Sequence, residues 1–269
     1  MLLDELAKYN QERWDELANA GVPYSRPYLD LDQKSARAVV DPYDIMGDVK
    51  GKDVLCLAGG GGQQSVAFAL LGANVTVLDL STVQLERDRE AAEHYGVSVN
   101  TFEGDMRDLS RFYNTPFDIV WHAHSLNFVP DAVAVFKEVR SVLREDGLYQ
   151  FSYHNPFTHG VKPEDWTGNA YPIRQPYVNG EVTYDWEWPK WDVAQDDGTV
   201  KSIEGPREFR HTLSTVVNGL VANGFLILGA WEHGSSETDP KAGSWEHYKS
   251  IVPPYLIFWT RYRPEVFKS

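Results

Sequence analysis

Four consecutive glycines, Gly59 to Gly62, are the residues of this sequence that most clearly indicate chemistry. They follow the apolar run Val54 to Leu57 and precede a second apolar run that begins at Ser65. A strand that turns through glycine into a helix brings bare backbone and a positive helix N-terminus close to a ligand. A plain tight turn needs only one or two glycines, so the stretch predicts a loop that binds a nucleotide-type cofactor.

An acidic residue, Asp79, ends the next apolar run. A carboxylate at this distance after a glycine loop can accept hydrogen bonds from both hydroxyls of a ribose. Such a ribose occurs in NAD and in S-adenosylmethionine, so the two motifs together leave the cofactor open. The dinucleotide fingerprint G-x-G-x-x-G/A requires a third small apolar residue, and Ser65 stands at that position.

The glycine loop and Asp79 require a regular series of strands and helices to position them. The apolar runs predict strands that end near Leu57, Asp79 and Glu103, a fourth strand over 117–124 and a fifth over 144–151, with a helix over 135–143 before the fifth. Strands that alternate with helices in this way form a doubly wound, mostly parallel sheet. Ligands bind beyond the carboxyl ends of its strands, which is where Gly60, Asp79, Asp105 and His122 fall.

This succession, over residues 45–155, closely resembles the class I S-adenosylmethionine-dependent methyltransferases. In that family the glycine loop holds the methionine end of the cofactor, an acid after the second strand binds the ribose, and a Gly-Asp pair after the third strand binds adenine. The resemblance implies the following cofactor-binding residues: Ala58, Gly59, Gly60, Gly62 and Gln64 in the loop, Asp79 as ribose ligand, Leu80 against adenine, Gly104, Asp105 and Met106 at the adenine, and His122 on the fourth strand.

The loop departs from the family pattern acid-x-Gly-x-Gly-x-Gly at two positions. Cys56 stands in place of the acid, and Ala58 stands in place of the first glycine. The acid often orients the loop or the methionine amino group, so its absence removes one means of holding the loop.

The end of the chain favours a methyltransferase over a dehydrogenase. Residues 225–232 and 254–262 predict two strands, and the segment between them lacks a strand or crossover-helix pattern. An antiparallel hairpin fits such a connection. The resemblance implies an antiparallel strand inserted in the sheet, which NAD-type Rossmann domains generally lack. We therefore expect an α/β fold with a seven-stranded sheet, a C-terminal antiparallel strand and an aromatic-rich insertion.

We expect one domain with four regions: an N-terminal helical lid over 1–45, a cofactor-binding core over 46–154, a substrate-side insertion over 155–208, and a C-terminal helix and strand pair over 209–269. Alternating apolar residues around Asn179-Gly180 predict a β-hairpin in the insertion. Insertions at this point build the acceptor pocket in the family, although these aromatic residues could instead form a small core of their own. The substrate-binding candidates are Tyr24, Tyr28, Tyr171, Arg174, Trp186 and Trp188.

Methyl transfer from a sulfonium is an in-line displacement that often requires a proton acceptor near the nucleophile. His154, after the fifth strand, and His124, after the fourth, are the catalytic candidates. A hydrogen-bonded structural role is the alternative for each. Oxygen, nitrogen and sulfur acceptors stay open. The other functional hypotheses are a nucleotide-dependent oxidoreductase and a non-catalytic protein that binds S-adenosylmethionine.

The composition of the chain limits the kinds of partner that it is expected to bind. The chain has 39 acidic and 25 basic residues, a net charge of −14 and no basic run, which argues against nucleic-acid binding. No apolar run approaches the ~20 residues of a membrane span, and the N-terminus lacks the pattern of a signal peptide. The histidines and acids lack metal-ligand spacing. We expect a cytoplasmic monomer or homodimer that uses S-adenosylmethionine, releases S-adenosylhomocysteine and methylates a small molecule.

Overall fold

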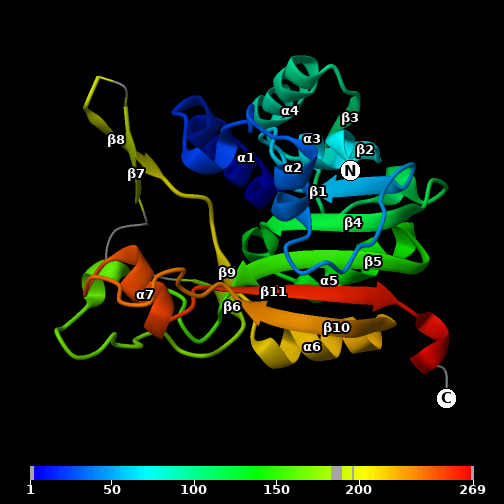
Figure 1. The fold of residues 1–269 in the computed structure, drawn as a ribbon. Helices are drawn as coiled ribbons and strands as arrows, with labels where there is room; N and C mark the ends of the chain where they lie inside the picture. Colours follow the sequence, from blue (N-terminus) through cyan, green and yellow to red (C-terminus); the bar gives the residue numbers. More distant parts are fainter. Residues whose placement is uncertain (1–2, 183–189, 196, 268–269) are drawn as a thin grey trace.

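The computed structural model describes residues 3–182, 190–195 and 197–267 of the chain. A seven-stranded sheet forms its centre, with the strand order β10-β11-β5-β4-β1-β2-β3 (Figure 1). The strands are β1 (Asp53–Leu57), β2 (Asn74–Asp79), β3 (Val99–Glu103), β4 (Phe117–His124), β5 (Leu143–His154), β10 (Phe225–Glu232) and β11 (Tyr255–Tyr262).

Strand direction in this sheet confirms the expected fold. Strands β1 to β5 pair in parallel, and β11 lies antiparallel between β5 and β10. The predicted antiparallel hairpin is therefore β10 and β11. The carboxyl ends of β1, β2, β4 and β5 consequently meet at one edge, on the left of Figure 1.

Helices cover both faces of the sheet because the strand side chains alternate between them. Leu55 and Leu57 of β1 pack in one core with α5 and α6, whereas Val54 and Cys56 pack in a second core with α2 and α3. The helices are α1 (Glu5–Asn19), α2 (Gln33–Val40), α3 (Gln64–Leu70), α4 (Thr82–Tyr95), α5 (Ala132–Val142), α6 (Leu213–Ala222) and α7 (Trp245–Ile251). Short 3-10 turns are η1 (Pro23–Ser25), η2 (Ser110–Phe112), η3 (Leu126–Phe128), η4 (Pro163–Asp165) and η5 (Pro264–Phe267).

Helix α4 begins directly after the carboxyl end of β2. The Ser81 hydroxyl accepts the amide of Gln84 at 3.1 Å as an N-cap, and Gly96 ends the helix with φ of 64°. The charged run over 83–95 lies within this helix. Its buried side, which includes Leu85 and Asp88, faces the glycine loop and the sheet.

The predicted hairpin around Asn179-Gly180 is wrong. Strand β6 (Gly180–Glu181) pairs instead with β9 (Phe209–Arg210), far along the chain. The Asn179 side chain binds the start of α6, accepting the amide of Thr212 at 2.8 Å and donating to Thr215 Oγ1 at 2.8 Å. A hairpin does occur later in the insertion, between β7 (Lys190–Ala194) and β8 (Val200–Glu204). Trp186 and Trp188 lie outside the described residues.

Segments from both ends of the chain gather where the parallel strands end. Figure 1 shows α1, the β7–β8 hairpin and α7 on this side of the sheet. Helix α1 packs against α4 and β8, as a cover over the strand ends requires. Helices α2 and α7 were not predicted from the sequence. Within the described part of the chain, every helix is too short or too polar to cross a membrane.

Candidate active site

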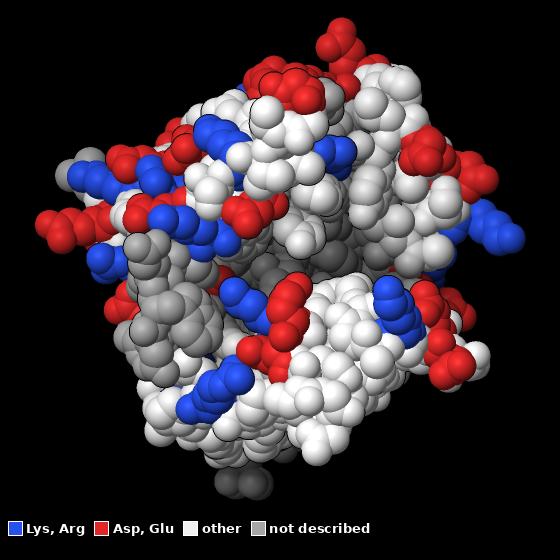
Figure 2. Space-filling view, turned by 90° about the vertical axis from the view of Figure 1, so that its left-hand side faces the viewer, with Lys and Arg blue, Asp and Glu red and all other residues white. Residues whose placement is uncertain are grey.

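A cavity of about 750 Å³ opens at the carboxyl ends of the parallel strands. Figure 2 looks onto this side of the molecule and shows a hollow near its centre. Ligand pockets in proteins span roughly 300–1,000 Å³, so the cavity is large enough for more than a small solute. Its wall contains residues of α1, the glycine loop, the ends of β2, β4 and β5, and the insertion.

Two buried carboxylates hold the glycine loop. Asp79 Oδ2 accepts the amide of Gly60 at 2.9 Å. Asp88, on α4, accepts the amides of Gly61 at 3.2 Å and Gly62 at 3.1 Å. A Cβ on Gly60 would lie 2.6 Å from Cβ of Gln84, so only glycine fits between the loop and α4. The loop therefore has one fixed shape at the cavity wall.

This arrangement bears on the choice of cofactor. In a dinucleotide-binding domain the amides of the glycine loop face a pyrophosphate. Here three successive amides already donate to carboxylates of the protein, and a phosphate at this point would meet two acidic side chains. The loop is therefore unsuited to a pyrophosphate, whereas a cofactor that offers hydroxyl donors to Asp79 fits it.

Asp79 lies in the cavity wall at the end of β2. Burial raises its pKa from 3.8 to about 6, although the amides of Ser81 and Gly60 favour its ionised form. Ser81 donates to Oδ1 at 2.8 Å and Gly60 to Oδ2 at 2.9 Å, which leaves a lone pair on each oxygen. Two ribose hydroxyls match these two acceptors.

Asp88 explains how the loop is held without the acid that Cys56 replaces. Cys56 is fully buried among apolar side chains, and burial raises the pKa of its thiol. The acid comes from the neighbouring helix instead: Asp88 is also fully buried, and the Ser65 hydroxyl donates to it. Sequence reasoning did not identify Asp88, because its spacing from the loop matches no motif.

The structure brings seven of the predicted cofactor residues into the cavity wall. These are Ala58, Gly60, Gln64, Asp79, Leu80, Gly104 and Met106. Four others, Gly59, Gly62, Asp105 and His122, are not among the lining residues. The carboxylate of Asp105 pairs with Arg107, and His122 Nδ1 lies 2.9 Å from the Tyr149 hydroxyl within the core.

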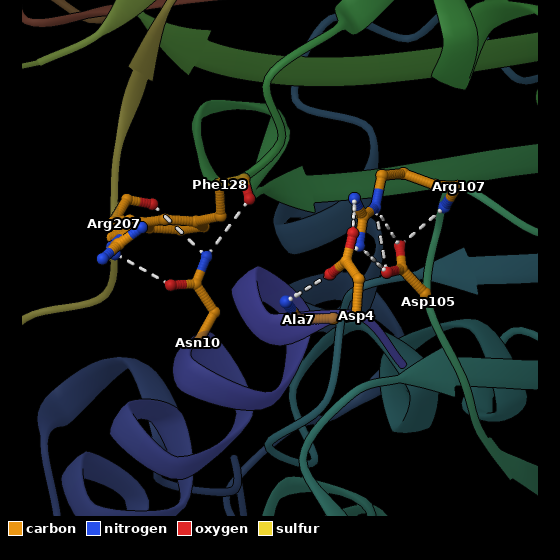
Figure 3. A network of polar contacts seen from close by, with 7 residues as sticks. All are labelled: Asp4, Ala7, Asn10, Asp105, Arg107, Phe128 and Arg207. Carbon is orange, nitrogen blue, oxygen red and sulfur yellow. Dashed lines mark hydrogen bonds and ion pairs between the residues drawn. The ribbon is translucent and has the colours of Figure 1, made fainter. Parts of the chain in front are cut away.

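Helix α1 covers the cavity, and polar contacts of Asn10 and Asp4 help to fix it in place (Figure 3). The Asn10 side chain accepts the amide of Arg207 at 2.8 Å and donates to the carbonyl of Phe128 at 3.2 Å. Arg107 joins Asp4 at the start of α1, at 2.9 Å, to Asp105. Asn10 and Trp14 of this helix line the cavity, as a lid requires.

The two predicted catalytic histidines both line the cavity. Burial lowers the pKa of His124 and of His154 to about 3, so both imidazoles are neutral near pH 7. His124 Nδ1 and His154 Nε2 are buried without a hydrogen-bond partner among the described residues. Such orphaned nitrogens at the end of β4 and β5 are consistent with a ligand that completes them.

A second pair of residues at this end was missed by the sequence reasoning. His159 Nε2 lies 2.9 Å from Glu208 Oε2, and both residues line the cavity. The His159 ring stacks on that of His154, with centroids 4.2 Å apart. The short interval from His154 to His159 was a usable signal, but the contact with Glu208 depends on the path of the insertion.

The predicted substrate residues divide into two groups. Tyr24 and Tyr28 line the cavity. Tyr171 and Arg174 lie away from it: the Tyr171 hydroxyl is 2.9 Å from His247 Nδ1, and Arg174 forms an ion pair with Asp165 at 2.9 Å. Other aromatic residues line the wall. Trp191 belongs to the aromatic insertion from which substrate contacts were expected, whereas Trp14, Phe128 and Tyr255 were not predicted.

Four of the lining aromatic rings, those of Trp14, Phe128, Trp191 and Tyr24, form a continuous wall. Trp14 contacts Phe128 and Trp191 edge to face, with centroids 5.2 and 5.6 Å apart, and Tyr24 contacts Trp191 at 5.8 Å. The wall thus joins α1, η3 and β7. Among the residues that the structure describes, no group of three or more His, Cys, Asp and Glu side chains could hold a metal ion.

Known proteins resemble the chain in sequence. Residues 55–151 match the family described as a methyltransferase domain. The uncharacterized methyltransferase YbaJ of Bacillus subtilis is 32% identical over 244 residues, which cover 86% of this chain and 91% of that protein. A ubiquinone biosynthesis O-methyltransferase of Actinobacillus pleuropneumoniae is 34% identical over 39% of this chain and 47% of its own length. A tRNA 5-carboxymethoxyuridine methyltransferase of Escherichia coli is 33% identical over 40% of this chain and 41% of its own length.

Solved structures share the fold. An S-adenosylmethionine-dependent methyltransferase from Mesorhizobium loti superposes with a TM-score of 0.63 and 23% identity, covering 87% of this chain and all of the other. The sheet order, the buried carboxylate of Asp79 in the cavity wall and the similarity to YbaJ over nearly the whole chain agree with one another. The chain belongs to the class I S-adenosylmethionine-dependent methyltransferases.

Proposed function

We propose that this enzyme methylates a small molecule that binds under the aromatic wall of the cavity. The observation that carries the proposal is the continuity of the cavity, because a single wall includes Asp79 at one end and His124 and His154 at the other. Transfer between two bound molecules requires that both lie in one enclosed space with their reacting atoms in line.

S-adenosylmethionine, when bound, supplies an electrophilic methyl group that bonds to the acceptor atom while the carbon–sulfur bond breaks and its electron pair stays on sulfur, giving S-adenosylhomocysteine. In our proposal Asp79 accepts the ribose hydroxyls, and the backbone at Ala58 and Gly60 lies against the methionine end. Leu80, Gly104 and Met106 form the adenine site. Helix α1 excludes water from the reacting atoms.

A small acceptor is favoured over a nucleic acid by charge. Nucleic-acid binding depends on clustered Lys and Arg that neutralise phosphates. The chain carries 39 acidic against 25 basic residues, and around the hollow of Figure 2 basic side chains are interspersed with acidic ones. The tRNA-methylating relative matches over only 40% of this chain.

The proposal is tested first by calorimetric titration with S-adenosylmethionine, S-adenosylhomocysteine and NADH. We expect the two sulfur nucleosides to bind and NADH not to bind. Labelled S-adenosylmethionine is then supplied with small phenols, amines and thiols in one series and with total tRNA in another. Label transferred to tRNA, and to none of the small molecules, would contradict a small-molecule acceptor.

A further inference from the structure

We propose that His159, held by Glu208, is the proton acceptor of the acceptor site and that the acceptor is a phenol-type hydroxyl compound. The inference rests on the proposed function and extends it to the nucleophile. It assigns a catalytic role to a pair that the sequence motifs do not identify.

The pair has the geometry of an oriented base. His159 Nε2 and Glu208 Oε2 are 2.9 Å apart, and the His159 side chain is 1% exposed. The hydrogen bond places the proton of the neutral ring on Nε2, so Nδ1 carries the lone pair. Nδ1 is buried and has no partner among the described residues. A carboxylate that fixes the tautomer and ring orientation of a histidine also stabilises the imidazolium that forms when it takes a proton.

The stacked neighbour, His154, lacks this support. The two rings are 18° from parallel with centroids 4.2 Å apart, and in this arrangement their nitrogens do not point at one another. The pair therefore cannot pass a proton through a direct hydrogen bond between the rings. A positive charge on one ring disfavours a charge on the other, so only one of the two takes the proton. His159 is that ring, because it alone has a direct hydrogen bond to Glu208.

Burial and the charges around His159 determine the protonation state of its ring before the acceptor binds. Burial, with Arg210 and His211 nearby, lowers its pKa to about 3, so the ring is neutral near pH 7 and able to accept a proton. Glu208 raises the pKa of the neighbouring His154, against the larger effect of burial. Proton transfer from the acceptor creates an imidazolium that lies between the Glu208 carboxylate and a developing oxyanion. These two negative groups compensate for the burial of the positive ring.

The walls of the cavity indicate the rest of the acceptor. Trp14, Phe128 and Trp191 present rings that contact edge to face, and Tyr255 lies against His124 at 4.4 Å. Such a wall favours a flat aromatic ligand. A phenol combines this flat body with a hydroxyl whose proton must leave during methyl transfer. That proton passes to Nδ1 of His159 as the oxygen lone pair forms the new bond to carbon.

The test uses para-nitrophenol, whose phenolate absorbs visible light and whose neutral form does not. The probe is added to the complex with S-adenosylhomocysteine at a pH below its own pKa. We expect the wild type to bind it as the phenolate, and Glu208→Gln and His159→Gln to bind it as the neutral phenol. Glu164→Gln, at an exposed residue after His159, is the matched control and should behave as the wild type.

Activity gives a second readout. With S-adenosylmethionine and the same phenol, we expect Glu208→Gln to lower turnover by on the order of 100-fold while the affinity for S-adenosylhomocysteine stays the same. Glu164→Gln should keep the turnover of the wild type. The rate of the Glu208→Gln variant should rise with pH as the phenol ionises in solution, whereas the wild-type rate should depend less on pH.

Three results would overturn the inference and leave the proposed function standing. They are bound para-nitrophenol in the neutral form in the wild type, an unchanged spectrum in Glu208→Gln, and transfer to thiols or amines but not to phenols. Failure of para-nitrophenol to bind would also overturn it. Absence of S-adenosylhomocysteine binding to the wild type would instead refute the proposed function itself, so the two failures are distinguishable.

Discussion

Asp88 Oδ1 on α4 accepts the backbone amide of Gly62 at 3.1 Å. The same carboxylate accepts the amide of Gly61 and the hydroxyl of Ser65, so one buried side chain fixes the turn from β1 into α3. Burial raises its pKa from 3.8 to about 7, and Asp79 contributes by like-charge repulsion. The loop shape therefore depends on a buried acid whose pKa is raised towards neutral pH.

Asp88 should make the stability of the protein depend on pH. Because its folded pKa is raised, the folded state keeps a proton that the unfolded chain loses, and stability falls as pH rises from 3.8 to about 7. Asp88→Asn removes this contribution. The free energy of unfolding, measured with urea, should fall between about pH 5 and about pH 8, and it should fall further in the wild type than in the variant. Equal losses would contradict the assignment.

Asp79→Ala should weaken binding of S-adenosylmethionine. The carboxylate lies in the cavity wall with a lone pair open on each oxygen, and hydrogen bonds to a charged group contribute about 1.5–3 kcal/mol. Calorimetric titration measures the loss, with Asp30→Ala at an exposed position as control. An unchanged affinity would mean that Asp79 does not bind the ribose.

The same binding should depend on pH through Asp79. Ionised Asp79 accepts hydroxyl protons better than its protonated form, and burial, with Asp15 nearby, raises its pKa to about 6. Affinity should therefore be constant above this pKa and fall by up to about tenfold per pH unit below it. Asp79→Asn should bind weakly at every pH with no such step. A wild-type affinity that does not change between about pH 7 and about pH 5 would refute this linkage.

Gly60→Ala should disturb the loop at its tightest point. The added Cβ would lie 2.6 Å from Cβ of Gln84 and 3.0 Å from Asp79 Oδ2, and such overpacking costs about 1–3 kcal/mol. We expect lower thermal stability together with weaker S-adenosylmethionine binding. Gly234→Ala is the control, because nothing lies within 4 Å of its added Cβ. If both variants have the same thermal stability and the same affinity for S-adenosylmethionine, the close approach at Gly60 does not matter for function.

Asn10→Ala should loosen the cover over the cavity. The side chain is 1% exposed and binds the backbone of Phe128 and Arg207, whose groups would lose their partner at a cost of about 1–3 kcal/mol. In this variant, hydrogen exchange should be faster than in the wild type for the amides of α1, and unchanged for those of β4 and β5. Glu12→Ala, at an exposed position of the same helix, should leave α1 protected. Uniform acceleration throughout the protein would argue for global destabilisation instead.

The cofactor side of the site was predictable because its information is local. The glycines, Asp79 and the strands before them are close in sequence, and strand order in an α/β sheet follows from the alternation of elements. The acceptor side depends on long-range pairing. Gly180 pairs with Arg210 between two strands, Glu208 contacts His159, and the ring of Trp14 contacts that of Trp191. No local sequence pattern specifies these contacts.

Arg174 and Tyr171 were predicted to bind substrate, but they do not line the cavity. Both residue types suited a substrate pocket, but an arginine in an acidic chain has many partners, and Arg174 pairs with Asp165. Asp88 was missed for a related reason: on a helix of mixed charge, nothing in the sequence distinguishes a fully buried acid from its exposed neighbours. Burial of a charged residue depends on the tertiary fold.

The contacts of Asn10 also order the events of biosynthesis. Its partners lie 118 and 197 residues further along the chain. A ribosome releases α1 well before Arg207, which emerges only after the parallel strands have been made. The contacts between Asn10 and Arg207 therefore form only after the insertion has been synthesised. The cavity is therefore closed late in translation by a helix that was made before the strands beneath it.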